Sequence, residues 1–246
     1  MQSALRYGLV LALCGYGCTL STEQSNNEYL PDPGFDLAHS DPAAVELADS
    51  VMSALGGRKS WTEARYLTWD YDTLRTIAWD KRDGRLRIES RPDSTVYLLN
   101  LVTGKGKVSV GGREVTASDD LREKLRAADS LWRHDSFWIT IIYQLKGDGI
   151  TLHYLGEART DTARYNLLRV ALEPDTEAPV EEFLAYVDLR DNGIRFCTDL
   201  RNSTRELVWY GSGYQQQGDL RLPSQAGAAH NIRVHRTLPD KTFNAF

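Results

Sequence analysis

Apolar residues repeat with two different periods along this chain, and the changes between them predict its order of helices and strands. Within residues 40–57 the spacing is three and four, which predicts an amphipathic helix with one buried stripe. The stripe consists of Ala44, Leu47, Ala48, Val51, Met52 and Leu55. Asp41 and Pro42 at the beginning and Gly56-Gly57 at the end are typical of helix boundaries.

From Arg65 the period becomes two, which predicts strands with one apolar face. Three segments alternate in this way, and a fourth, residues 96–102, is more continuously apolar. The alternating apolar positions are Leu67, Trp69, Tyr71, Ile77, Trp79, Leu86 and Ile88. Asp83-Gly84 has the form of a hairpin turn, and connections this short join only antiparallel neighbours. We therefore predict an antiparallel meander in this half of the chain.

A helical interval follows the meander. Ser118 caps it, acidic residues occupy its first turn, and its first half carries one apolar stripe. That stripe consists of Leu121, Leu125, Ala128 and Trp132. The second half, residues 137–145, is apolar nearly all round. Such a segment must be buried on both sides or face something apolar.

Strands resume at Ile150 and continue to the end, with another strong hairpin signal at Asp191-Asn192-Gly193. Together the two halves predict one antiparallel sheet of roughly eleven to twelve strands. A twisted sheet of this size curls into a barrel or a partial barrel. The predicted fold class is therefore α+β, with a curled antiparallel sheet and a helical insert.

The amino terminus has the features of an export signal. Arg6 is followed by an apolar run of about 11 residues, which is too short to span a hydrocarbon core of about 30 Å. Gly17-Cys18 resembles the cleavage and lipidation site of bacterial lipoproteins, although Gly15 stands where leucine is usual. We expect a signal peptide at 1–17, lipidation at Cys18, a polar tether at 18–39 and one domain at 40–246; plain secretion is the alternative.

Composition and charge narrow the class of protein. The chain has 246 residues, 41% hydrophobic and 26% charged, as in ordinary globular proteins. Its net charge of −5 argues against nucleic acid as a partner, because nucleic-acid binders normally carry a basic surplus. Once residues 1–17 are removed, Cys197 is the one cysteine besides Cys18, so no internal disulfide forms in the mature chain without Cys18 itself. A lone thiol on a strand is more often structural than catalytic.

Motifs of catalysis and metal binding are missing from the sequence. It contains no G-x-x-x-x-G-K-[ST], no H-E-x-x-H, no G-x-S-x-G and no paired C-x-x-C. Asp119-Asp120 suits the positive end of a helix dipole better than acid–base catalysis. The histidines are scattered: His39, His134, His153, His230 and His235. We expect no catalytic residue, metal or cofactor; the competing hypothesis, an exported hydrolase, would depend on His134 or His153.

Several segments within residues 40–246 occur in a characteristic pattern and order. They are ADSVMSALGG with Trp61 after it, FWITIIYQLKGDGITLHYLGE at 137–157, YNLLRVALE and EFLAYVDL with the hairpin to Gly193-Ile194, and GDLRLP at 218–223. In this pattern and order of elements the chain resembles the LolA/LolB-like superfamily of bacterial lipoprotein carriers, in its outer-membrane lipoprotein-sorting-like, uncharacterised lipoprotein branch.

This resemblance implies a half-open β-barrel whose apolar concave face is covered by helices and holds acyl chains. If the strand alternation holds, the apolar strand positions all face that side. The expected groove residues are Trp69, Trp79, Ile88, Leu98, Leu125, Trp132, Trp138, Ile142, Val187, Phe196 and Trp209. The superfamily also has an arginine that latches the covering helix and a loop that enters the membrane. Arg75 and residues 103–106 stand in loosely similar places, without matching text.

The sequence therefore predicts a cell-envelope lipoprotein that binds lipid or lipoprotein acyl chains without catalysis. We expect a monomer, held on the periplasmic face of the outer membrane by its lipid anchor. Burial of a sixteen-carbon chain would release on the order of 12 kcal/mol, at about 0.8 kcal/mol per CH₂, before ordering costs. The alternative is an envelope scaffold or interaction lipoprotein in which the same side chains fill the core and leave no room for a ligand.

Overall fold

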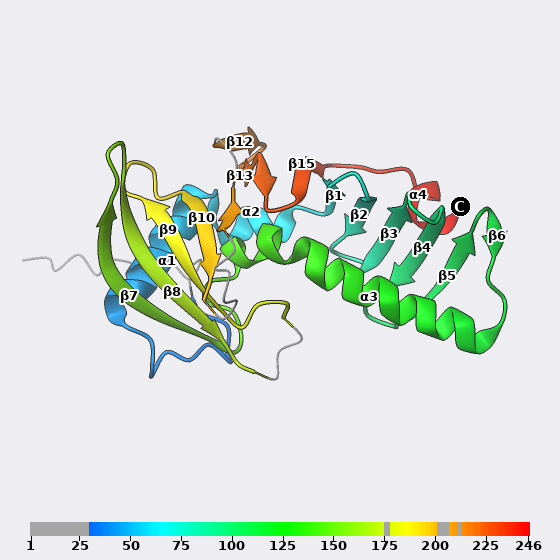
Figure 1. Ribbon diagram of the computed structural model, residues 1–246, viewed down its shortest axis with the longest axis horizontal. Coiled ribbons are helices and arrows are strands. Elements are labelled where there is room, and N and C mark those ends of the chain that lie inside the picture. The colour runs from blue at the N-terminus through cyan, green and yellow to red at the C-terminus, as the bar shows by residue number, and fades with distance from the viewer. Residues whose placement is uncertain (1–29, 175–177, 201–206, 211–212) are drawn as a thin grey trace, which may run out of the picture.

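The computed structural model describes residues 30–174, 178–200, 207–210 and 213–246. The predicted signal peptide and Cys18 lie outside these residues. The described chain forms two antiparallel sheets, a small hairpin, and helices that pack between and around them (Figure 1). None of the described helices combines the length and the apolar character needed to cross a membrane.

Eight strands form the large sheet, in the order β14-β15-β1-β2-β3-β4-β5-β6. Every neighbouring pair is antiparallel, as the short connections of the meander predict. The strands are β1 (Tyr66–Tyr71), β2 (Arg75–Asp80), β3 (Arg85–Ser90), β4 (Thr95–Asn100), β5 (Lys105–Val110), β6 (Arg113–Glu114), β14 (Gln225–Ala226) and β15 (Ala229–His235).

Five strands form the small sheet, in the order β11-β10-β9-β8-β7, and two more form a separate hairpin, β12-β13. They are β7 (Ile150–Arg159), β8 (Arg164–Leu172), β9 (Glu182–Asp188), β10 (Ile194–Asp199), β11 (Leu207–Trp209), β12 (Tyr214–Gln217) and β13 (Leu220–Pro223). The expected curled antiparallel architecture is therefore confirmed, but the strands divide into three sheets instead of one.

Helix α3 (Ser118–Thr140) is the reason for this division. In the sequence α3 comes directly after β6, the last strand at one edge of the large sheet. From there the helix runs across the strands of the large sheet to the small sheet (Figure 1). At 1.5 Å per residue its 23 residues span about 34 Å, so β7 begins far from β6 and opens a new sheet. The 3₁₀ helix η2 (Ile141–Tyr143) completes the connection. The remaining helices are α1 (Pro42–Ala54), α2 (Gly57–Glu63) and α4 (Lys241–Asn244).

One continuous apolar core joins both sheets to α1, α3 and η2. The segment 137–145, predicted to be buried on both sides, has Phe137, Ile139, Ile142 and Leu145 in this core. Its backbone is also fastened from the other side, because the Tyr210 hydroxyl donates to the Trp138 carbonyl at 2.9 Å. The end of α3 is therefore held between the two sheets by core packing and by this hydrogen bond.

The packed structure begins before residue 40, the boundary expected between tether and domain. Phe35 is buried in the core. The backbone N–H of Asp32 donates to the carbonyl of Lys146, and that of Asp36 to the carbonyl of Ile150, both at 3.0 Å. Residues 32–36 thus run along the entrance to β7.

Strand register shows that the apolar strand positions do not all share one face. On the large sheet, Ile88 pairs with Tyr97 and Leu86 with Leu99, so Tyr97 and Leu99 face α3. Leu98 pairs with Arg87 and faces the opposite side, where it lines a shallow hollow together with Phe243 of α4. Because 96–102 is apolar on both faces, alternation could not assign its inner side.

The small sheet shows a second departure from the predicted alternation. A bulge between Ile194 and Phe196 shifts the register of β10, so Phe196 pairs with Tyr186 while Cys197 turns to the core. Trp209 pairs with Phe196 and is 52% exposed. The prediction that Phe196 and Trp209 share the face of Val187 is therefore wrong, because a one-residue shift reverses the faces of a strand.

Candidate functional site

A hollow of about 1100 Å³ lies between the amino-terminal half of α3 and the β4–β5 hairpin. We call it the α3 groove. Two leucines one helical turn apart, Leu121 and Leu125, come from α3, and Leu99 and Leu101 come from the end of β4 and its turn. Its other lining residues are Gly104, Lys105, Gly106, Ser118, Arg122, Arg126, Asp129, Ser130, Arg133, His134 and Pro179.

Gly106 sets how closely α3 approaches the sheet at this groove. A Cβ at this position would lie 2.9 Å from Leu125 Cδ2 and 2.0 Å from the Leu98 carbonyl oxygen. Neither separation is tolerated between non-bonded atoms, so only glycine fits here. Gly104, with φ of 66°, supplies the left-handed turn between the two strands. The two glycines of the 104–107 segment thus shape the floor and the turn of the groove.

Cationic side chains surround the apolar floor. Lys105 comes from the hairpin, and Arg122, Arg126 and Arg133 come from α3. Asp129, the one carboxylate among the described lining residues, accepts a hydrogen bond from Arg133 Nε at 2.8 Å. The groove therefore combines a leucine floor with a basic rim.

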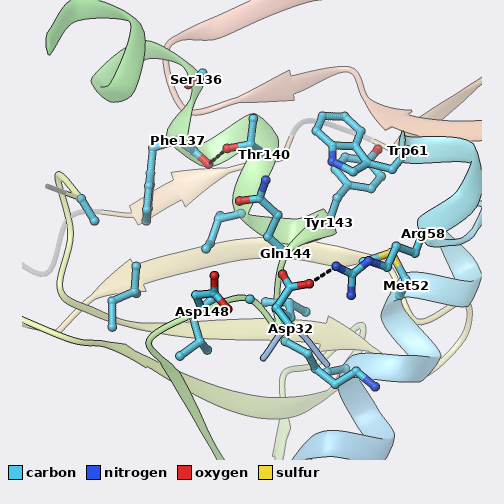
Figure 2. Close-up of a pocket in the computed structure, with 18 of the residues that line it drawn as sticks. Asp32, Met52, Arg58, Trp61, Ser136, Phe137, Thr140, Tyr143, Gln144 and Asp148 are labelled. Carbon is cyan, nitrogen blue, oxygen red and sulfur yellow. Dashed lines mark hydrogen bonds and ion pairs between the residues drawn. The ribbon is translucent and has the colours of Figure 1, made fainter. Parts of the chain in front are cut away.

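A second hollow of about 540 Å³ lies where α1, α2 and the end of α3 meet; we call it the α1–α3 pocket (Figure 2). Trp61 and Tyr143 stack on one of its walls, with ring centroids 4.2 Å apart and planes 3° from parallel. Met52 and Phe137 add further apolar surface. Three carboxylates and three cations also line it, in close pairs such as Asp32 with Arg58.

Lys81 reaches the outer side of this aromatic wall. Its ammonium nitrogen lies 3.7 Å from the Trp61 ring centroid and donates to the Trp61 carbonyl. Burial lowers the pKa of Lys81 to about 8. The lowered pKa means that burial disfavours the charged form of Lys81 by more than its two contacts with Trp61 favour it.

The two hollows adjoin each other along α3. Arg133 and Pro179 line both of them. Pro179 belongs to the connection between β8 and β9, and neighbouring Val180 is buried in the core. The carboxyl-terminal side of that connection therefore lies between the α3 groove and the α1–α3 pocket.

A buried ion pair fastens the middle of α3 to the large sheet. Arg75 of β2 donates from Nε to Asp135 Oδ2 at 2.6 Å and from Nη2 to Asp135 Oδ1 at 2.8 Å. The Asp135 side chain is fully buried, and this hydrogen bonding raises the pKa of Arg75. Arg75 also lies over the Tyr71 ring, 4.8 Å from its centroid. Arg75, one of the two places suggested by the resemblance, thus contacts the covering helix directly.

The eleven residues expected in the groove occupy several different environments. Leu125 lines the α3 groove and Trp132 the α1–α3 pocket. Trp132 meets Trp79 edge to face at 5.2 Å between α3 and β2. Trp138 packs on Phe183, 5.3 Å away between ring centroids. The remaining inward positions are core residues exposed by 1% or less: Trp69, Ile88, Ile142 and Val187. Leu98, Phe196 and Trp209 lie on outer faces, as described above.

The indole nitrogens of Trp69, Trp79 and Trp132 are buried and have no hydrogen-bond acceptor among the described residues. The Trp residues therefore contribute mainly apolar surface where α3 covers the sheet. Buried indole N–H groups usually have a partner, which makes this junction unusual for a protein core.

Sequence reasoning did not find the basic rim, because exposed arginines on one helix face are also what an ordinary solvated helix presents. A spacing signal existed: Arg122, Arg126 and Arg133 recur at four and seven residues, beside the Leu121–Leu125 stripe. Among the described residues, no group of three or more His, Cys, Asp or Glu is placed to hold a metal ion. His134 lies beside Asp135, at 3.1 Å, and His153 beside Asp41, at 3.6 Å.

No protein-family model and no curated protein matches the sequence. Among solved structures, the chain is similar to a DUF1329 family protein from Desulfovibrio piger, with 12% identity and a TM-score of 0.40 over 83% of this chain and 98% of that one. It is also similar to a putative outer membrane lipoprotein-sorting protein domain from Vibrio parahaemolyticus, with 9% identity and a TM-score of 0.40 over 82% of this chain and 96% of that one. A LolA superfamily protein from Nitrosomonas europaea shares 10% identity with a TM-score of 0.33, over 80% of this chain and 96% of that one.

Proposed function

We propose that this protein binds the acyl chain of a lipid or of an acylated protein in the α3 groove, and that it does so without catalysing a reaction. The observation that carries the proposal is the leucine floor of a hollow of about 1100 Å³. Ligand pockets typically have volumes of about 300–1,000 Å³, so the groove has room for one or more acyl chains. Such a site needs no catalytic group.

The energetics support the proposal. Burial of a sixteen-carbon chain contributes on the order of 12 kcal/mol, from about 0.8 kcal/mol per CH₂. Association costs roughly 4–15 kcal/mol in lost freedom. The difference is compatible with reversible binding, which is what a carrier or receptor requires.

The test is binding of a fluorescent palmitoyl probe to the full chain. The Leu101→Asp variant places a carboxylate on the groove floor and should weaken binding by at least about tenfold, since an acyl chain seated there would strip water from the charge at a cost in free energy. Val102→Asp is the matched control, because Val102 is adjacent but 82% exposed and does not line the groove. Lack of probe binding by the native chain, or equal affinity of the native chain and Leu101→Asp, would refute the proposal.

A scaffold function is the second candidate, and one specific observation favours it. The concave face of the large sheet is closed by the protein's own side chains, with Trp69, Ile77 and Ile88 exposed by 1% or less. A ligand therefore has no room at the centre of the sheet, where the sequence placed the groove. Mass spectrometry of lipids extracted from gently purified protein separates the two functions: a scaffold carries no stoichiometric lipid, and an acyl binder does.

The proposed location is the cell envelope, with the mature chain anchored through acylated Cys18 on the periplasmic face of the outer membrane. Intact-mass measurement of protein from the membrane fraction should show cleavage before Cys18 and a mass increase from acylation. The Cys18→Ser variant should appear in the soluble fraction. Recovery of unmodified protein cleaved at another position would support plain secretion instead. We also expect a monomer by light scattering.

A further inference from the structure

We infer that the α3 groove selects amphiphiles with a phosphate headgroup, so that its natural ligand is an anionic phospholipid. This inference rests on the proposed function, and it adds the chemistry of the headgroup. Its basis is the charge of the rim: among the described residues that line the groove, four carry cationic side chains and one is a carboxylate. The chain as a whole has a net charge of −5, so this cluster of cationic side chains is opposite in sign to the overall charge.

Two of the rim cations are available for a ligand. Arg133 is engaged by Asp129 at 2.8 Å, and Arg122 by Asp119 at 3.1 Å. Lys105 and Arg126 form no ion pair with any described residue. They also come from opposite walls, Lys105 from the β4–β5 hairpin and Arg126 from α3. A headgroup at the mouth of the groove would therefore meet a cation on each side.

Phosphate matches these two side chains chemically. Arginine donates two parallel hydrogen bonds to a phosphate, and lysine contributes a compact point charge. The leucine floor below the rim accepts the acyl chain at the same time, because Leu121 immediately precedes Arg122 and Leu125 immediately precedes Arg126 on the same helix. The helix thus carries apolar and cationic contacts side by side along one groove.

The α1–α3 pocket provides an internal contrast. Its lining has three cations, Arg58, Arg133 and Lys146, and three carboxylates, Asp32, Asp49 and Asp148. Lys146 lies against Asp49, as Arg58 does against Asp32. Since the charges of the described lining residues balance, they offer no excess attraction for an anion. The selectivity we infer is therefore a property of the α3 groove.

Competition against the fluorescent palmitoyl probe tests the inference with three ligands. Palmitoyl lysophosphatidic acid and monopalmitoylglycerol share one acyl chain and differ by the phosphate, and glycerol phosphate is the headgroup alone. For the native chain, the phosphate-bearing lipid should displace the probe at about tenfold lower concentration than the neutral lipid, as expected for charge-assisted hydrogen bonds. This preference should shrink in high salt. Glycerol phosphate alone should not displace the probe.

The double variant Lys105→Gln/Arg126→Gln should abolish the preference, so that the two lipids displace the probe at the same concentration. The matched control is Arg82→Gln/Arg159→Gln, which removes two exposed cations that do not line the groove. Equal binding of both lipids by the native chain, or an unchanged preference in the double variant, would overturn the inference and leave acyl binding intact. Displacement by glycerol phosphate would identify a simple anion site and also overturn it. Failure of both lipids to bind would refute the proposed function itself.

Discussion

Replacement of Arg75 by methionine leaves the Asp135 carboxylate buried without its cation. The Asp135 side chain is 0% exposed and that of Arg75 only 15%, so water cannot replace the two hydrogen bonds of 2.6 and 2.8 Å. Breaking a buried pair by removing one partner costs about 3–5 kcal/mol of stability. For a protein of this size, each kcal/mol lowers Tm by roughly 2–4 °C, so we expect a decrease of about 6–20 °C.

Urea unfolding of the single variants and of Arg75→Met/Asp135→Leu measures this effect. The double variant should be more stable than either single variant, because an apolar pair leaves no uncompensated charge. His134→Ala is the control: His134 also contacts Asp135, at 3.1 Å, but is 58% exposed, so its removal should cost under about 1 kcal/mol. A loss below about 1 kcal/mol in Arg75→Met, or additive losses in the double variant, would refute the reasoning.

Three further predictions concern titratable groups. Arg190 holds the pKa of Asp188 well below its usual range, so this carboxylate stabilises the fold above pH of about 4 and loses that effect as pH falls. Asp188→Asn should therefore lower the free energy of unfolding more at pH 7 than at pH 2, as urea titrations would show. Because the pKa of Lys81 is about 8 in the folded protein, the free energy of unfolding should rise between pH 8 and about 10, and Lys81→Met should flatten that rise. Burial raises the pKa of the Cys197 thiol, and peptide mapping should find this residue unalkylated by iodoacetamide until the protein unfolds.

Much of the fold could be predicted because period and turn residues act locally. The stripe from Ala44 to Leu55 became α1 and its carboxyl-terminal cap, and Asp83-Gly84 lies in the turn between β2 and β3. Features that depend on strand pairing could not be predicted in this way. The bulge at Ile194 reversed the face of Phe196, and the strands divided into separate sheets, because each outcome depends on how the strands pair in the folded protein.

The candidate site was predicted less well than the fold. Large apolar residues such as Trp69 and Ile88 were expected in the groove, but they are core residues, because the most apolar positions are those that the protein buries with its own side chains. The α3 groove is instead lined by Leu101 and Leu121, which are only partly buried, and by arginines. Sequence periodicity distinguishes a buried face from a solvated one, but it does not show where packing stops short of contact.

The pairing of β1 with β15 has a consequence for how the chain acquires its structure. Asp70 and His230, which pair in this register, are 160 positions apart, so the large sheet closes only after nearly the whole chain has been synthesised. Contacts of such separation slow folding. Until β15 arrives, β1 is an open edge with unpaired backbone groups, which is a known route to aggregation. A chain that ends before residue 229 would therefore leave the backbone groups of this edge unpaired.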